Sequence, residues 1–164
     1  WVPGLQLSYF VVIGRGNAGD EDVGTAPSWQ THAVMASFEH RYFTTTAQFV
    51  TGEGNQKGSF TDYLTQSDPL TGEPHIVGID RTHSYDGASG FLEVKLPWIK
   101  SSIIGRYDYF NRDAHRGTHR IIGGYAFHFF KMHKNFVMVD VDYVLNEGPA
   151  PDMWETKLTL QIKL

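Results

Sequence analysis

Hydrophobic and polar residues alternate along most of this chain with a period of two. In residues 136–145 (FVMVDVDYVL), apolar side chains alternate with a second set that includes Asp140 and Asp142. Residues 157–164 repeat the plan, with leucine and isoleucine alternating with Lys157 and other polar residues. Successive side chains of a strand point to opposite faces of a sheet. Each segment therefore predicts a β-strand with one hydrocarbon face and one polar or charged face.

The same alternation predicts eight strands in all. The connections after the second, fourth and sixth strands are short, and the others are longer and more polar. Long outer loops are expected at 14–28 and 52–86, with a turn at residues 69–72 in the second loop. This order predicts an antiparallel up-and-down meander with both termini on the short-turn side. The expected strands are residues 2–13, 29–40, 43–51, 87–96, 102–110, 119–130 and 136–145, and a last strand that follows a connection at 146–153 and includes residues 157–164.

Aromatic residues gather near the ends of these strands. Two aromatic girdles at the boundaries of a membrane would produce that distribution. The alternation of short turns and long loops is also typical of a meander inserted in an outer membrane. A soluble up-and-down barrel of the lipocalin type has the same periodicity, with its apolar face turned inward. The aromatic residues are Tyr42, Phe43, Trp98, Phe129, Phe130 and Phe136 beside the short turns, and Trp29, Tyr107, Tyr109, Tyr143 and Trp154 towards the loops.

The polar face carries full charges in the middle of strands. A charge exposed to hydrocarbon at mid-depth costs about 2–4 kcal/mol, so these side chains are expected to face a lumen. The fold prediction is an all-β, antiparallel, up-and-down transmembrane β-barrel. Its eight strands form either a complete small barrel or the C-terminal part of a larger porin. The predicted lumen positions are Glu39, Gln48, Glu93, Lys95, Arg106, Asp108, His128, Asp140, Asp142, Lys157 and Gln161.

Composition narrows the functional classes. The 164 residues suit one domain, and 17 glycines with 14% aromatic residues favour β structure with tight bends. The chain has no cysteine, which excludes disulfides and thiolate metal sites. A net charge of −4 gives no reason to expect a nucleic-acid partner.

Several short motifs resemble the C-terminal region of Gram-negative outer-membrane porins, particularly the phosphate-selective porin-like group. The resemblance implies an outer-membrane location with periplasmic termini, contact with lipid and lipopolysaccharide, and a possible homo-oligomer or partner protein. The motifs are EHRYFTTTAQFVTGEGN (39–55), GFLEVKLP (90–97), IIGRYDYFNRD (103–113), RIIGGYAFHFFKMHKN (120–135), VMVDVDYV (137–144) and KLTLQIKL (157–164).

The expected function is passive diffusion of small polar or ionic solutes through a charged lumen, with the 52–86 loop constricting or capping the entrance. The alternative is a non-conducting small barrel that acts as a scaffold or a partner-binding wall, with its first and last strands hydrogen-bonded. Neither function needs a cofactor, a metal or enzymatic activity.

A glycine-rich segment offers a competing reading. Gly14, Gly16 and Gly19 follow an apparent strand with the spacing of a dinucleotide-binding fingerprint. That fingerprint needs a helix next, and no helical period follows here. The segment is therefore expected to be an outer loop, in which the acidic residues 20–22 are solvated rather than metal-bound.

Histidines are the remaining candidates for chemistry. His115 and His119 lie four residues apart in a predicted loop with Asp113, where an exposed pair is expected rather than a metal site. His128 on the polar face, near Asp108, would suit a membrane-embedded hydrolase or acyltransferase. No serine stands in a nucleophile-elbow context, so a histidine with a structural role in the wall is favoured.

Overall fold

The computed structural model describes residues 3–15, 27–57, 59–112, 115–129 and 135–162. The described part is all-β, with one turn of 3-10 helix. No helix among these residues is long and apolar enough to cross a membrane. The elements are β1 (Leu5–Arg15), β2 (Ser28–Glu39), β3 (Phe43–Glu53), β4 (Thr61–Ser67), β5 (Pro74–Thr82), β6 (Ser84–Leu96), η2 (Pro97–Ile99), β7 (Ser101–Arg112), β8 (His115–His128), β9 (Phe136–Asn146) and β10 (Met153–Gln161).

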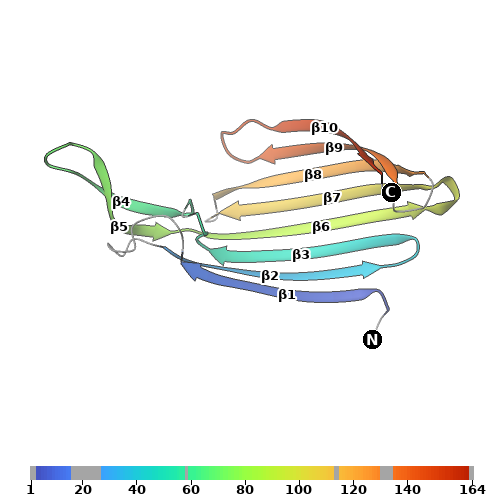
Figure 1. Ribbon diagram of the computed structural model, residues 1–164, viewed down its shortest axis with the longest axis horizontal. Coiled ribbons are helices and arrows are strands. Elements are labelled where there is room, and N and C mark those ends of the chain that lie inside the picture. Colours follow the sequence, from blue (N-terminus) through green and yellow to red (C-terminus); the bar gives the residue numbers. More distant parts are fainter. Residues whose placement is uncertain (1–2, 16–26, 58, 113–114, 130–134, 163–164) are drawn as a thin grey trace.

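Eight strands form one antiparallel sheet in the order β1-β2-β3-β6-β7-β8-β9-β10, which confirms the predicted meander. Both ends of the described chain lie at the edge of the sheet where the short turns are (Figure 1). The predicted barrel closure is not found, because β1 and β10 form opposite edges of an open sheet. Alternation specifies strands and faces, whereas closure depends on strand number, tilt and stagger around the whole barrel.

The predicted loop at 52–86 is wrong over most of its length, because it contains the two-stranded sheet of β4 and β5. This hairpin extends beyond the main sheet at the end opposite the termini (Figure 1). Register shifts after Asp62 and after Leu64 interrupt its alternation, which hides it from a search for a strict period of two. The predicted turn is confirmed: the amide of Gly72, at φ 71°, donates to the carbonyl oxygen of Asp68 over 2.8 Å.

Several strands are longer than expected at this end of the sheet. β7 reaches Arg112 and β8 starts at His115, so most of the polar loop expected at 111–118 is strand. The last strand starts at Met153, the last residue of the connection expected at 146–153. Polar and charged residues continue these strands because cross-strand hydrogen bonds hold the backbone whatever the side chain.

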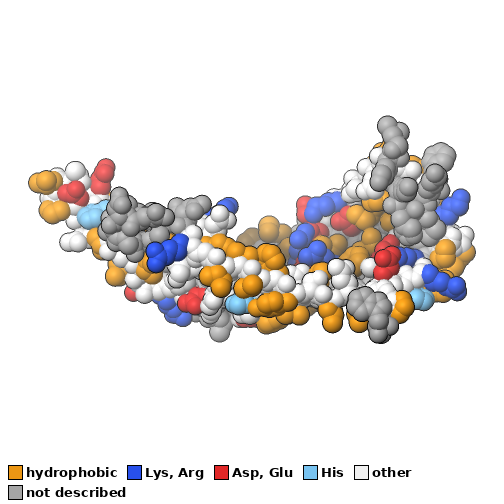
Figure 2. All heavy atoms as spheres, turned by 60° about the horizontal axis from the view of Figure 1, so that its bottom comes forward, with side chains coloured by type: hydrophobic (Ala, Val, Ile, Leu, Met, Phe, Trp, Pro, Cys, Tyr) orange, Lys and Arg blue, Asp and Glu red, His pale blue; other side chains and the backbone are white. Residues whose placement is uncertain are grey.

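The sheet is one layer, and it has almost no hydrophobic core. Among the described residues, the one buried hydrophobic side chain is Ala126, at 2% exposure. The molecule is curved, and Figure 2 shows charged side chains in its hollow and hydrophobic side chains along its outer side. We call the polar face in the hollow the trough face and the opposite face the outer face.

Candidate functional site

The strand registers place all the predicted lumen positions on the trough face. Residues directly opposite each other in an antiparallel pair share a face. One row across the sheet links Lys157, Asp140, Gly124, Ile104, Glu93, Thr44 and Glu39 in that order. The next row links Glu155, Asp142, Ile122 and Arg106, and the third links Arg120, Asp108, Ser89 and Gln48. At the short-turn end, Lys95 lies opposite Ser102, and His128 and Gln161 both lie opposite Phe136.

Asp142 is the centre of the main ionic network on the trough face. Its side chain is 3% exposed, although it lies in a single-layer sheet. Arg120 Nε donates to one carboxylate oxygen over 2.9 Å and Lys157 Nζ donates to the other over 3.3 Å. Lys157 also pairs with Glu155 on its own strand. The four side chains join β8, β9 and β10 through charge-assisted hydrogen bonds.

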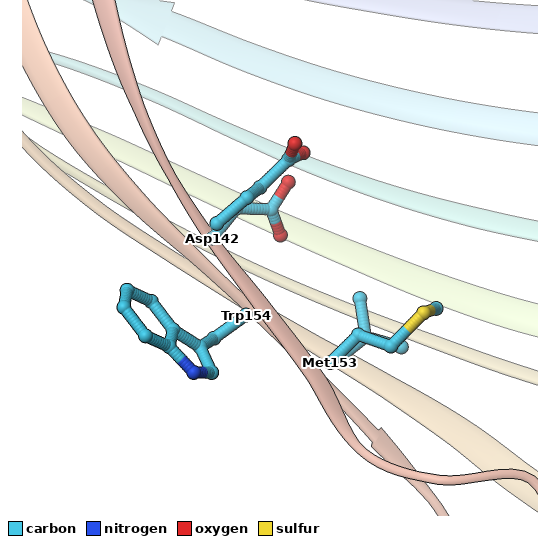
Figure 3. Close-up of a pocket in the computed structure, with 5 residues that line it drawn as sticks. Asp142, Met153 and Trp154 are labelled. Atoms are coloured by element: carbon cyan, nitrogen blue, oxygen red, sulfur yellow. The ribbon is translucent and has the colours of Figure 1, made fainter.

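An open pocket lies beside this network, lined by Asp142, Val144, Met153, Trp154 and Glu155. In Figure 3, Asp142 points across the hollow, whereas the ring of Trp154 lies on the other side of the strand. The pair shows directly how alternation separates a carboxylate from an aromatic ring that are adjacent in the fold.

Two further ion pairs lie on the trough face towards the middle of the sheet. Lys95 Nζ lies 3.3 Å from Glu39 Oε1, across the intervening strand β3. Arg106 Nε lies 2.9 Å from Asp108 Oδ1, which also accepts from the hydroxyl of Ser89. The registers place β6 beside β7 and β9 beside β10, as the predicted meander requires.

Sequence reasoning missed Arg120 and Glu155, although both belong to the Asp142 network. Both residues lie inside the expected strands, but the alternation was followed only from Ile122 and from Lys157. Arg120 has the same parity as Ile122, and Glu155 has the same parity as Lys157. Continuing each alternation by one more position of the same parity would have placed both side chains on the polar face.

His128 lies apart from Asp108, contrary to the expectation. Asp108 lies opposite Arg120, eight residues along β8 from His128. His128 is 5% exposed, and its Nε2 lies 3.2 Å from the hydroxyl oxygen of Ser102. Ser102 is itself 1% exposed. Sequence reasoning did not identify this serine as a partner, because it lies on the neighbouring strand β7, 26 residues away along the chain.

His119 takes part in a chain of hydrogen bonds on the outer face. Tyr107 Oη lies 2.7 Å from His119 Nδ1, and His119 Nε2 lies 3.0 Å from Glu147 Oε1. The hydrogen bond from His119, with a second from the Gly117 amide, lowers the pKa of the Glu147 carboxyl below its usual value. His115 and His119 lie in β8 rather than in a loop, and Asp113 lies outside the described residues. In the described ranges, no group of three histidine or acidic residues could hold a metal ion.

The aromatic girdles are only partly as expected. Tyr107, Tyr109, Tyr143 and Trp154 lie on the outer face, whereas the registers place Trp29 and Phe136 on the trough face. Trp29 covers Gly14, where an added Cβ would come within 3.0 Å of the indole ring. Gly14 thus lies next to the end of β1, beneath a ring. Residues 16–26, which include Gly16, Gly19 and residues 20–22, lie outside the described residues.

The outer face is a continuous apolar surface. Val139 and Val141 are each 47% exposed, and Leu158 is 74% exposed. From Val137 to Leu145, β9 covers about 27 Å along the strand. The exposed apolar side chains of this face include Leu7, Tyr9, Val11, Val34, Phe49, Leu92, Val94, Ile103, Tyr107, Ile121, Tyr125, Phe127, Val139, Val141, Tyr143, Trp154, Leu158 and Leu160.

Comparisons with protein-family models, with curated proteins and with solved structures found no significant match for this chain.

Proposed function

We propose that this chain forms part of the wall of a porin-like outer-membrane β-barrel, through which small polar or ionic solutes diffuse passively. In this proposal the outer face contacts the acyl chains of lipid and lipopolysaccharide, and the trough face contacts water and solute. The short-turn side, with both termini, faces the periplasm of a Gram-negative bacterium. The mechanism needs no covalent step, since the wall acts only by shape and charge.

One observation carries this proposal: hydrocarbon side chains gather on the outer face of the curved sheet, and ionic side chains gather in its hollow (Figure 2). A soluble protein of this size would bury Val139, Val141 and Leu158 against a second layer of structure. Here they are exposed, while Asp142 and Asp140 are 3% and 8% exposed. Lipid is the solvent that makes this arrangement favourable, and a lipocalin-like interior would require the reverse.

The open edges of the sheet bear on the size of the barrel. Unpaired backbone groups are costly in a bilayer, so β1 and β10 must each acquire a further strand partner. Further strands of the same protein or of another copy would serve, and they would enclose a lumen wider than that of an eight-stranded barrel. This favours a conducting barrel over the alternative of a small, self-closed scaffold.

The β4–β5 hairpin has a different place in the proposal from the one expected for the 52–86 segment. It extends past the sheet, so it would stand at the mouth of the barrel rather than within the trough (Figure 1). Its base is fixed by Phe60, whose ring packs against Tyr85 and Phe110 and lies beneath the guanidinium of Arg112. At this place it would contact solutes or partners before they reach the wall.

Planar-bilayer recording tests the proposal. The full-length protein is purified in detergent and added to one side of a bilayer in about 1 M KCl, which screens surface charge. It should insert in discrete conductance steps. Protein unfolded in urea and added at the same concentration is the control. Absence of steps from protein that is folded, and that floats with lipid vesicles in a density gradient, would contradict a porin role.

A further inference from the structure

The ionic pairs of the trough face leave a remainder of negative charge. On this face the described residues include six carboxylates, Glu39, Glu93, Asp108, Asp140, Asp142 and Glu155. They also include five bases, Lys95, Arg106, Arg112, Arg120 and Lys157. Arg112 stands at the loop end, over the ring of Phe60. The four bases in mid-sheet are each paired with an acid.

Asp140 and Glu93 are the acids that these pairs leave out. Among the described residues, neither of the two side chains forms a hydrogen bond or an ion pair. Lys157 lies directly opposite Asp140 in the register, yet its ammonium group turns along the strand to Asp142 and Glu155. Lys157, the base opposite Asp140, therefore pairs with two other carboxylates.

Asp140 is sheltered but open to the trough. The residue is 8% exposed, yet its carboxylate oxygens are not sealed from solvent, so a cation in the trough can reach them. Gly124 of the neighbouring strand provides its space, since a Cβ there would come within 3.1 Å of Asp140 Cβ. Glu93 lies in the same register row, beyond Gly124 and Ile104, so the two uncompensated charges lie at one level of the trough.

We infer that Asp140, with Glu93, makes this wall cation-selective by binding monovalent cations transiently as they pass. The inference rests on the proposed pore function and specifies its solute class. The paired charges form compact dipoles whose fields cancel over a short distance, whereas Asp140 and Glu93 act on an ion at longer range. Cations should therefore be favoured even though acids and bases are mixed along the wall.

The test is the reversal potential of the full-length protein in planar bilayers under a KCl gradient. The wild type should be more permeable to K⁺ than to Cl⁻. Asp140→Asn should lower the K⁺ to Cl⁻ permeability ratio by about twofold to fivefold. Glu93→Gln should act in the same direction and Asp140→Glu should retain selectivity. Glu53→Gln, the same change as Glu93→Gln but at an exposed position on the outer face of β3, should leave the ratio unchanged.

The possible outcomes distinguish a failure of the cation-selectivity inference from a failure of the proposed pore function. Conductance with a preference for Cl⁻, or a ratio unaffected by both Asp140→Asn and Glu93→Gln, would overturn cation selection and leave the pore intact. Loss of all conductance steps in the wild type would overturn both. If Asp140→Asn does not fold, the Glu93→Gln ratio decides, because Glu93 is less buried and the substitution keeps its shape.

Discussion

Asp142 holds three strands together through one carboxylate. Its oxygens accept from Arg120 on β8 and from Lys157 on β10, while its own backbone pairs with both strands. Such a network contributes to the free energy of unfolding mainly because removing one member leaves the other charges unpaired. Without the carboxylate the two cations would repel each other, and the buried position between them would lose its charge-assisted hydrogen bonds.

Asp142→Asn should accordingly lower the free energy of unfolding by about 1–3 kcal/mol, since the amide keeps the shape but not the charge. Urea titration of the detergent-solubilised protein, followed by tryptophan fluorescence, measures the change. Asp80→Asn on the exposed β5 strand is the matched control, and it should shift the value by less than about 0.5 kcal/mol. A loss for Asp142→Asn no larger than that of the control would show that the network adds little stability.

At the scale of a single element, β10 displays both chemistries of the sheet. Leu158 on its outer face is 74% exposed, and Thr159 follows it on the trough face. The two positions are adjacent in sequence and lie at nearly the same depth. They differ in the solvent that the proposal assigns to them.

Leu158→Lys should therefore impair insertion into lipid vesicles by about 2–4 kcal/mol, whereas Thr159→Lys should insert like the wild type. The fraction folded in vesicles, measured by protection from protease and by migration of unboiled samples on gels, gives the comparison. Were the outer face in water, Leu158→Lys would instead be harmless and would improve solubility. Equal insertion of the two variants would contradict the lipid assignment of this face.

For the whole molecule, the decisive feature is the open sheet. β1 pairs with β2 alone and β10 with β9 alone, so each edge strand presents a row of unpaired backbone groups. In water such edges invite aggregation, and in a bilayer they are more costly still. At the membrane location that we propose, this curved sheet of eight strands would need further strands at both edges.

The folded particle in detergent should accordingly have a protein mass well above the 18.5 kDa of this sequence. Light scattering coupled to size-exclusion chromatography, corrected for bound detergent, measures that mass. A heat-denatured sample provides the mass of the single chain for comparison. A uniform particle of 18.5 kDa that retains β structure by circular dichroism would contradict the need for further strands and restore the small closed barrel.

Much of the sheet follows from the sequence because alternation is a local property of an extended chain. The parity of Asp140 and Asp142 against Val139 and Val141 assigns their faces before any neighbour is known. The parity of Arg120 and Glu155 carries the same information, which was missed because the alternation was followed only from Ile122 and Lys157. The β4–β5 hairpin escaped because its bulges break the parity on which the prediction depends.

The sequence by itself determined the eight strands, their antiparallel order and the residues that share the polar face. The tertiary structure alone decided that this face lies in the hollow, that the sheet stays open, and that Lys157 pairs with Asp142 rather than with Asp140. The physical reason is that alternation depends on each residue's own backbone. Curvature, edge pairing and the choice among nearby charges depend on neighbours that only the assembled sheet brings together.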